Sequence, residues 1–328
     1  MTALRAGLIG LGMMGRHHAR VLGSLDDVDL VAVADPAGDP FGVAAGREVL
    51  GSVEKLIAAG IDYCVVAVPT VYHEEIGMTL AEAGVHALIE KPLAPGKAAA
   101  ARLAEAFATR GLVGAVGHIE RYNPALQQVR ARLDAGELGD IYQIITRRQG
   151  PFPARIADVG VVKDLATHDI DLTAWVTQHP FTSVAARTAF RSGREHEDLV
   201  AVVGYLADGT VTNHLVNWLS PLKERVTVIT GERGTFVVDT LAADLTFYAN
   251  GTVATEWDAV ASFRGVSEGD VIRYAFPKPE PLRTEHLAFR DAILGKDSYV
   301  VTMEQGLATV AVADAVLASS LQGATVQV

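Results

Sequence analysis

Three glycines near the N-terminus have the spacing that dinucleotide binding needs. Residues 10–15 read Gly-Leu-Gly-Met-Met-Gly, which matches the pattern G-x-G-x-x-G. The first glycine permits a tight turn, the second lets the backbone approach a pyrophosphate, and the third allows close packing of helix on strand. A helix N-terminus at this point also attracts the anion. We therefore expect Gly10, Gly12, Met13, Met14 and Gly15 to bind a dinucleotide, with an ordinary glycine turn as the alternative.

A carboxylate follows this loop where a ribose-binding acid is expected. Asp35 lies twenty residues beyond Gly15, at the end of the second predicted strand, where it can accept two hydrogen bonds from an adenine ribose diol. The same carboxylate repels a 2′-phosphate, and no arginine follows it closely. The sequence thus predicts NAD rather than NADP. A turn beginning at Asp35-Pro36 is the other interpretation.

An acid and a histidine in the second half of the chain have the spacing of a shared helix face. Asp164 and His168 are four residues apart, and Asp171 and Trp175 extend the same stripe. Such a pair can orient and move a proton. Alternatively, Asp164 is a helix N-cap and His168 its surface partner. The residues alone leave both interpretations open.

A lysine stands at the point where a doubly wound sheet binds its ligands. Glu90-Lys91-Pro92 follows the fourth predicted strand, at its carboxyl end. An ammonium there can stabilise negative charge that develops on a substrate oxygen. An isolated Lys-Pro pair, however, is more typical of an ordinary surface charge.

The elements that position these residues alternate between strands and helices over the first 120 residues. Runs that are apolar on both faces, as buried parallel strands are, cover 5–10, 28–35, 63–68, 85–90 and 112–118. Helical patterns lie between them at 13–25, 53–59, 73–83 and 97–109. This alternation predicts βαβ units and a doubly wound parallel sheet.

The pattern changes near residue 120. Asn123-Pro124 predicts a capped helix that ends at Gly136, and a second helix is expected over 164–177. Short strands fill 181–248, with turn signals at 207–209, 231–234 and 250–251. An extended proline-rich loop at 277–281 precedes helical patterns at 284–294 and 303–321. We predict an α/β fold of two domains: a Rossmann domain over 1–119, and an α+β domain with an open-faced mixed or antiparallel sheet over 120–328.

Composition limits the partners and the compartment. The chain has 328 residues, with 28 lysines and arginines against 39 aspartates and glutamates, and a formal net charge of −11. The excess acid argues against a nucleic-acid or anionic-membrane partner, and no apolar run approaches the roughly 20 residues that span a bilayer. The single cysteine, Cys64, excludes an internal disulfide and favours a reducing cytoplasm. His17 and His18 lack partners at ligand spacing, so no metal is expected.

These motifs together resemble the glucose-fructose oxidoreductase / inositol dehydrogenase (Gfo/Idh/MocA) family. The resemblance rests on the glycine loop, on Val68-Pro69-Thr70 with His73, on Glu90-Lys91-Pro92, and on Asp164 with His168. It implies that Lys91 bonds the substrate hydroxyl and the nicotinamide ribose, and that Asp164 and His168 complete the catalytic set. It also implies cofactor contacts at Pro69, Thr70, His73, Glu90 and Lys91.

Two segments resemble the sugar-nucleotide members of that family, particularly UDP-N-acetylglucosamine 3-dehydrogenases. They are residues 117–124 and 158–165. A diphosphate substrate needs local cations in a chain of charge −11. The candidates are Arg121, Arg147, Arg148, Arg155 and Lys163, although Arg147 and Arg148 point to opposite faces of one strand. We expect substrate contacts from Lys91, Arg121, Tyr122, Arg148, Lys163, Asp164 and His168, with packing as the alternative role of Arg121 and Tyr122.

The resemblance implies reversible oxidation of a secondary hydroxyl on a sugar or sugar nucleotide, with NAD as hydride acceptor. His168 would take the hydroxyl proton, Lys91 would stabilise the oxygen, and Asp164 would orient the histidine or the substrate. The family also implies a homodimer or homotetramer formed through the C-terminal sheet. A free polyol or hexose dehydrogenase, an NAD-dependent glycosidase and a non-catalytic nucleotide sensor remain alternatives.

Overall fold

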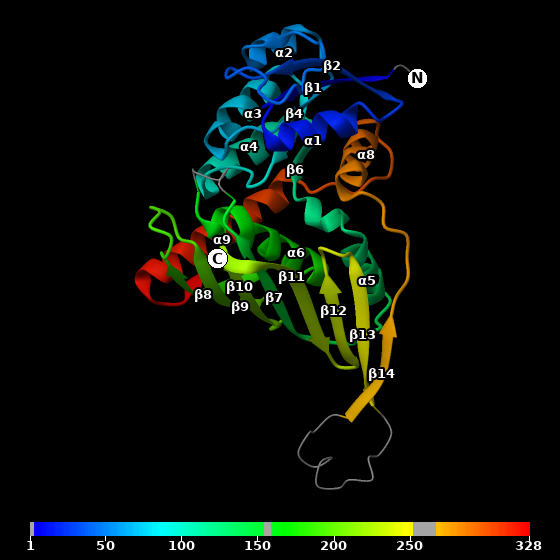
Figure 1. The fold of residues 1–328 in the computed structure, drawn as a ribbon, viewed down its shortest axis with the longest axis vertical. Helices are drawn as coiled ribbons and strands as arrows, with labels where there is room; N and C mark the ends of the chain where they lie inside the picture. Colours follow the sequence, from blue (N-terminus) through cyan, green and yellow to red (C-terminus); the bar gives the residue numbers. More distant parts are fainter. Residues whose placement is uncertain (1–2, 154–158, 252–266) are drawn as a thin grey trace. The chain divides into compact units, whose positions relative to one another are not determined.

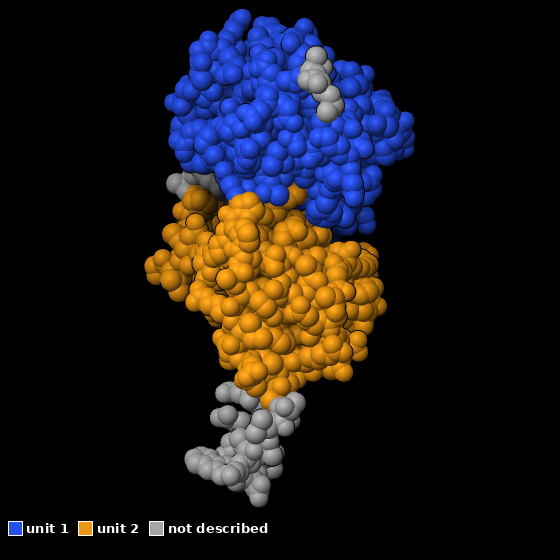
Figure 2. Space-filling view, turned by 90° about the vertical axis from the view of Figure 1, so that its right-hand side faces the viewer, with its two compact units in different colours: residues 1–119, 280–314 blue, residues 120–279, 315–328 orange. Residues whose placement is uncertain are grey.

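The chain folds into two compact units (Figures 1 and 2). The computed structural model describes residues 3–153, 159–251 and 267–328. One unit, blue in Figure 2, comprises Met1–Ile119 and Glu280–Asp314, and the other, orange, comprises Glu120–Pro279 and Ala315–Val328. We call them unit 1 and unit 2.

Unit 1 contains a six-stranded parallel sheet with the order β3-β2-β1-β4-β5-β6. Helix α3 packs on α2 and on α4, and α1 packs on α8, so helices cover both faces (Figure 1). This order is that of a doubly wound sheet. The strands are β1 (Leu4–Ile9), β2 (Val28–Ala34), β3 (Val49–Leu50), β4 (Tyr63–Val66), β5 (His86–Glu90) and β6 (Gly114–Gly117), and the helices of this part are α1 (Met13–Leu22), α2 (Val53–Ala58), η1 (Thr70–Tyr72), α3 (His73–Glu82) and α4 (Lys97–Thr109).

The predicted Rossmann architecture is therefore confirmed, with small differences at the ends of elements. The third strand, β3, escaped prediction because Val49–Leu50 is too short for any periodicity to show. The 3₁₀ turn η1 was not predicted either, and it lies immediately before α3.

A C-terminal segment belongs to unit 1, which corrects the predicted second domain of 120–328. Helix α8 (Pro281–Ile293) places Phe289 edge-on against Tyr63 of β4, with ring centroids 5.5 Å apart. Val116 of β6 donates its N–H to the carbonyl of Val301 at 2.9 Å. The first contact buries the large aromatic side chain of Phe289, and the second supplies a hydrogen-bond partner to the edge strand β6. The predicted boundary at 119/120 itself coincides with the division between the units.

Unit 2 is built on a nine-stranded mixed sheet, and this part of the predicted fold is also confirmed. Its order is β14-β13-β12-β11-β7-β10-β9-β8-β15, and among the strands described only β10 and β7 pair in parallel. The strands are β7 (Ile141–Pro151), β8 (Phe181–Ala189), β9 (Leu199–Leu206), β10 (Val211–Asn217), β11 (Leu219–Gly231), β12 (Gly234–Asp239), β13 (Asp244–Gly251), β14 (Ser267–Arg273) and β15 (Val326–Gln327).

Helices cover one face of this sheet and form its core. Leu126 and Val129 of α5 (Pro124–Asp134), with Leu172 and Val176 of α6 (Thr167–Thr177), pack on Phe236 and other inward residues of the strands. The predicted cap is present, because the side chain of Asn123 accepts the N–H of Ala125 at 3.0 Å. The remaining elements are η2 (Ile119–Tyr122), a π-helical turn η3 (Val162–Ala166) and α9 (Met303–Gln322), within which the division between units falls.

The predicted turns meet different outcomes. Residues 207–209 and 231–234 do connect antiparallel strands, between β9 and β10 and between β11 and β12. Asn250-Gly251 instead form the last residues of β13, so the predicted turn there is wrong. Both residues pair with β14, and this long-range pairing outweighs the local turn preference.

Candidate functional site

The glycine loop of unit 1 has the geometry that its pattern predicts. Gly10 has a φ of +94°, and a Cβ there would lie 2.3 Å from the carbonyl oxygen of Ala67. A Cβ on Gly15 would lie 1.9 Å from the carbonyl oxygen of Gly10, whereas one on Gly12 would meet nothing within 4 Å. Gly12 is the N-cap of α1 and offers no side-chain cap to the first helical amides. The loop thus presents open backbone donors to an anion.

A cavity of about 550 Å³ lies at this loop, within unit 1. Gly10, Gly12, Asp35 and Pro69 line it, and the other predicted cofactor residues do not. Its lining contains the acids Asp35, Glu54 and Glu75 but no lysine or arginine among the described residues. The sequence did not assign the other lining residues to the cofactor. They lie at strand ends, in loops and in the first turns of α2 and α3, and no local pattern shows that these parts meet at one cavity: Ile9, Pro36, Ala37, Gly51, Ser52, Val53, Glu54, Ala67, Val68, Tyr72, Glu75 and Ile76.

Asp35 anchors the glycine loop while facing this cavity. Its Oδ2 accepts the N–H of Leu11 at 2.8 Å, and its Oδ1 accepts the N–H of Ala37 at 2.8 Å. The turn interpretation of Asp35-Pro36 is therefore correct. Ribose binding by Asp35 stays a prediction, and it is compatible with the turn because each carboxylate oxygen can accept a second hydrogen bond.

His73 joins two turns rather than lining the cavity. Its ring is buried, with Nδ1 2.9 Å from the carbonyl oxygen of Pro92 and Nε2 3.0 Å from that of Val68. Burial lowers the pKa of His73, and the two carbonyls oppose that effect. A neutral ring donates to one carbonyl at a time. The predicted cofactor residues His73 and Thr70 are both buried.

The Glu90-Lys91-Pro92 motif stands at the carboxyl end of β5, as predicted. Lys91 is half-buried, and its peptide bond to Pro92 is cis. Glu90 Oε2 accepts the N–H of Lys91 at 3.1 Å, and Oε1 contacts His18 Nε2 at 2.9 Å. Burial pushes the pKa of Glu90 up, but His18 and Lys91 outweigh it, so the net shift is downward. Glu90 is therefore an anion held by its neighbours.

In unit 2, Asp164 and His168 stand where a π-helical turn passes into an α-helix. Asp164 lies within η3 and is buried, whereas His168 lies in the first turn of α6 and is half-buried. Asp164 is not an N-cap, because neither η3 nor α6 has a side-chain cap, so that alternative is wrong. Wide turns of this kind occur frequently at functional sites. Glu197 secures the turn by accepting the N–H of Val162 at 3.0 Å.

Two of the predicted substrate arginines are held in buried ion pairs of unit 2. Arg121 forms a two-pronged pair with Asp171 at 2.6 and 2.8 Å. Arg148 contacts Asp169 at 3.0 Å and Glu120 at 2.9 Å. Tyr122 is buried as well. These placements support the packing role of Arg121 and Tyr122.

Arg148 and Arg147 take opposite faces of β7, as the alternation of a strand predicts. Arg148 is 2% exposed, whereas the side chain of Arg147 is 52% exposed and pairs with Glu224. Lys163 is half-buried within η3. Arg155 lies outside the described residues, as does Asp158 of the motif segment 158–165.

A smaller cavity of about 210 Å³ lies beside Asp164 within unit 2. Arg148, Lys223 and Arg225 line it together with Asp164 and Trp218. Arg225 contacts Glu120 at 3.3 Å, and burial and Arg148 lower its pKa against the opposing effect of the acids. The sequence analysis missed Lys223 and Arg225. Their i, i+2 spacing on β11 was the available signal, because it places two cations on one face of a strand.

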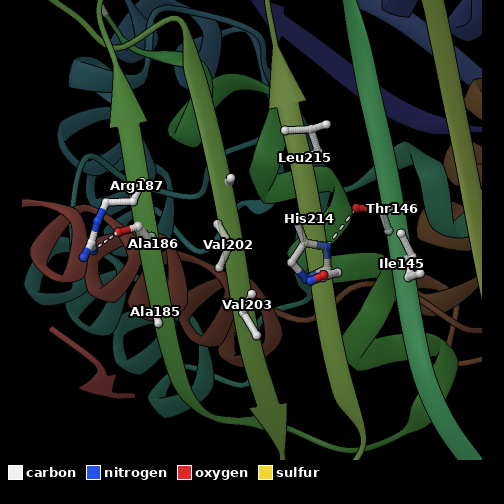
Figure 3. Close-up of a pocket in the computed structure, with 11 residues that line it drawn as sticks. Ile145, Thr146, Ala185, Ala186, Arg187, Val202, Val203, His214 and Leu215 are labelled. Atoms are coloured by element: carbon white, nitrogen blue, oxygen red, sulfur yellow. Dashed lines mark hydrogen bonds between the residues drawn. The ribbon is translucent and has the colours of Figure 1, made fainter. Parts of the chain in front are cut away.

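The face of the unit 2 sheet opposite the helices carries a shallow hollow of about 480 Å³ (Figure 3). Ile145, Ala185, Val203 and Leu215 line it, from four neighbouring strands. Ile145, Val203 and Leu215 are 37, 46 and 40% exposed. The predicted open face of the sheet is therefore partly apolar.

Comparison with known families adds to this geometry. The NAD-binding Rossmann-fold domain of the Gfo/Idh/MocA oxidoreductases matches residues 4–118, and a C-terminal domain of the same family matches residues 126–237. The chain belongs to the Gfo/Idh/MocA family. It is accordingly an oxidoreductase, and its N-terminal unit is an NAD-binding Rossmann domain.

Individual relatives of this family member are dehydrogenases. It is 32% identical to UDP-N-acetylglucosamine 3-dehydrogenase of Acidithiobacillus ferrooxidans over 65% of this chain and 66% of that enzyme. It is 30% identical to scyllo-inositol 2-dehydrogenase (NAD(+)) of Bacillus subtilis, over 56% of each chain. The solved structure of the Acidithiobacillus enzyme matches with a TM-score of 0.81 and 28% identity, covering 97% of this chain and 98% of that one.

Neither a membrane-spanning helix nor a cluster of metal ligands is found in the part of the chain that the structure describes. None of the helices described is long and apolar enough to cross a membrane. Nor do the described histidines, cysteines, aspartates and glutamates form a group of three or more that could hold a metal ion.

Proposed function

We propose that the protein is an NAD-dependent dehydrogenase that reversibly oxidises a secondary hydroxyl of a nucleotide-diphosphate sugar, with UDP-N-acetylhexosamine as the leading substrate. The observation that carries this proposal is the cavity of unit 2, where Asp164 meets Arg148, Lys223 and Arg225. Cations that line a cavity beside Asp164 suit a sugar that carries phosphate. The sugar-nucleotide relative supports the same assignment.

The residues of unit 1 fit NAD. The open space at Gly12 and the uncapped start of α1 accept a pyrophosphate, and Asp35 faces the cavity where a ribose diol binds. Three acids and no described lysine or arginine line that cavity, which disfavours a 2′-phosphate. When bound, NAD supplies the acceptor for the hydride of the carbinol carbon.

The side chains of this protein handle the proton and the oxygen of the reacting hydroxyl. His168 accepts the hydroxyl proton, which contributes about 10²- to 10⁴-fold in rate. Lys91 donates a hydrogen bond to the oxygen and stabilises its developing negative charge. Asp164, one helical turn before His168, orients the histidine or the substrate.

Calorimetry on the NADH complex tests the substrate class. UDP-N-acetylglucosamine and UDP are expected to release heat at millimolar concentration, and UDP-N-acetylglucosamine is expected to be oxidised with NAD. If UDP gives no heat while myo-inositol or a free hexose binds and is oxidised, the sugar-nucleotide assignment is wrong.

A dehydrogenase of free polyols is the second candidate, because scyllo-inositol 2-dehydrogenase is a relative of similar identity. Such an enzyme would have no use for Lys223 and Arg225 beside Asp164. Oxidation of scyllo- or myo-inositol that persists when both cations are neutralised would favour it.

We also propose that two subunits pair through the open face of the unit 2 sheet, giving a homodimer or homotetramer. Ala185, Val203, Asn213, Ile145 and Val228 form one row across five strands of that face. A second copy would bury the exposed side chains of Val203 and Ile145 in this row and of Leu215 beside it (Figure 3). Light scattering is expected to show a dimer or tetramer that Val203→Glu converts to a smaller species. Leu321→Glu, at an exposed leucine outside the sheet, is the control.

We propose a cytoplasmic location for the protein. Cys64, the only cysteine in the sequence, is a buried thiol with no second cysteine to pair with, so the fold needs no oxidising compartment for an internal disulfide. Cell fractionation with an antibody to the chain tests this location.

A further inference from the structure

Glu90 of the Glu90-Lys91-Pro92 motif belongs to a group of four buried ionisable side chains in unit 1. The other three have no part in the mechanism proposed above. His18 Nε2 is 2.9 Å from Glu90 Oε1, and His18 Nδ1 is 2.9 Å from His286 Nε2. Glu285 is fully buried next to His286 on α8 and interacts electrostatically with Glu90. We call these residues, His18, Glu90, Glu285 and His286, the His18 cluster.

The cluster joins three elements of unit 1. His18 comes from α1, the helix that follows the glycine loop, Glu90 comes from the end of β5, and His286 comes from α8. Because Glu90 Oε2 also accepts the N–H of Lys91, an unbroken series of hydrogen bonds runs from His286 through His18 and Glu90 to the Lys91 backbone.

The charge states of the cluster leave Glu90 as the anion to which His18 donates. Burial and the charge of Glu90 raise the pKa of Glu285 well above its usual value, which favours its neutral form. Burial and His18 lower the pKa of His286, which is therefore neutral too. A buried carboxylate without a donor is costly, and His18 supplies that donor to Glu90.

The backbone of β6 leaves room for this arrangement. Gly117 pairs with Glu90, and a Cβ at Gly117 would lie 3.3 Å from Glu90 Oε2. The Glu90 carboxylate therefore packs against the backbone of Gly117, where a larger residue would place a side chain. It is confined between Gly117 and His18.

We propose that His18 is a positioning residue for Lys91, acting through Glu90, and that His286 holds His18 in place. The imidazole Nε2–H fixes the Glu90 carboxylate, and the carboxylate fixes the start of the Lys91 turn. A shift of about 1 Å in a catalytic group can cost roughly a hundredfold in rate. The expected effect of His18 on turnover rests on the proposed function, in which Lys91 acts on the substrate oxygen.

A matched pair of substitutions separates positioning from packing. Glutamine places its amide nitrogen near the position of the imidazole Nε2, whereas asparagine places it near Nδ1. His18→Gln therefore keeps a donor for Glu90, and His18→Asn loses it. Both variants are neutral and leave a similar amide in the cluster.

Steady-state kinetics gives the first readout. We expect His18→Asn to lower kcat roughly ten- to hundredfold, with the dissociation constant of NADH within about threefold, and His18→Gln to restore most of the rate. His214→Asn, at a buried histidine of unit 2, is the control for a His-to-Asn change and is expected to keep the rate. Equal rates in both His18 variants, whether high or low, would overturn the proposal.

Chemical labelling gives a second readout that needs no substrate. Acetic anhydride is reacted with each intact protein, and mass spectrometry compares Lys91 with Lys55, an exposed lysine of α2. We expect Lys91 to be acetylated at least about threefold faster in His18→Asn than in His18→Gln or the wild type, because the turn opens more often. If the wild type oxidises no sugar, the proposed function fails, and identical Lys91 labelling in all three proteins still refutes the positioning role.

Discussion

The cavities of the two units are built from different parts of the chain. The cavity of unit 1 relies on backbone: a glycine with open space, an uncapped helix start and an acid that anchors the loop. The cavity of unit 2 relies on charged side chains, with Asp164 beside Arg148, Lys223 and Arg225. A chain of net charge −11 can therefore accept a pyrophosphate without placing lysine or arginine against it. In a cavity lined by charged side chains, by contrast, substitution of a few residues can alter the ligand specificity.

The largest expected effect concerns the groups that act on the reacting hydroxyl. Lys91→Ala and His168→Ala are each expected to lower kcat by roughly two or more orders of magnitude. The affinity for NADH, measured by fluorescence titration, is expected to stay within several-fold because the proposed roles of both groups lie mainly at the substrate oxygen or proton. Asp164→Asn is expected to slow turnover too. Full turnover by His168→Ala at any pH between 6 and 9 would remove His168 as the base.

The next effect tests the backbone-built cavity. NADH is expected to bind about ten- to a hundredfold more tightly than NADPH, a difference of about 1 to 3 kcal/mol from the carboxylate of Asp35. Asp35→Ser is expected to narrow that ratio, since it removes the repulsion of a 2′-phosphate. Tighter binding of NADPH by the wild-type protein would contradict the role given to Asp35.

A third prediction concerns buried histidines that differ in how many ring nitrogens have a polar partner. In unit 1 both ring nitrogens of His18 and of His73 face polar atoms. In unit 2 His214 Nδ1 contacts Thr146 at 2.8 Å (Figure 3), while Nε2 has no partner among the described residues. Burial lowers the pKa of His214 from 6.5 to about 4.

Because the folded pKa of His214 is depressed, its contribution to stability is present above pH 6.5 and is lost as the pH falls toward 4. Between pH 7 and pH 5 we expect a loss of about 2 kcal/mol in the free energy of unfolding from this residue. Urea unfolding at both pH values measures it, and His214→Gln is the comparison variant. An equal loss in wild type and variant would show that His214 is not responsible.

The smallest effect tests the side-chain-built cavity. Lys223→Gln and Arg225→Gln are each expected to raise the KM for UDP-N-acetylglucosamine by about tenfold with little change in kcat, because each removes a uniform attraction for phosphate. Arg147→Gln is the matched control, since Arg147 is exposed on the opposite face of β7. An unchanged KM in the first two variants would mean that this cavity does not hold the diphosphate.

Local sequence patterns were sufficient for most of unit 1. The glycine pattern at Gly10, Gly12 and Gly15 involves only residues close together in the chain. The same is true of the signals that bound α4, whose predicted ends agree with the observed Lys97–Thr109. The same holds for Asn123, whose capping bond spans two residues. The short strand β3 was invisible because two residues show no period.

Long-range pairing explains the predictions that the structure changed. Asn250-Gly251 has a local turn signal, yet both residues pair with β14. Residues 280–314 follow the sheet of unit 2 in sequence, yet Phe289 packs on Tyr63 of unit 1. In each case the contacting residues are too far apart in the chain for a local sequence pattern to predict the contact.

The sequence by itself determined the conformation of the glycine loop and the place of Asp35 directly after β2, because each depends on short spacings. The shared helical face of Asp164 and His168 stays a prediction, since Asp164 lies in the π-helical turn η3. Only the tertiary structure decided which cations form buried ion pairs and which of them also line a cavity. Arg121 and Arg148 meet Asp171 and Asp169 across 50 and 21 residues, and Arg225 meets Glu120 across 105. Charges that far apart in the chain are assigned to partners by strand register and helix packing, which no local run of residues encodes.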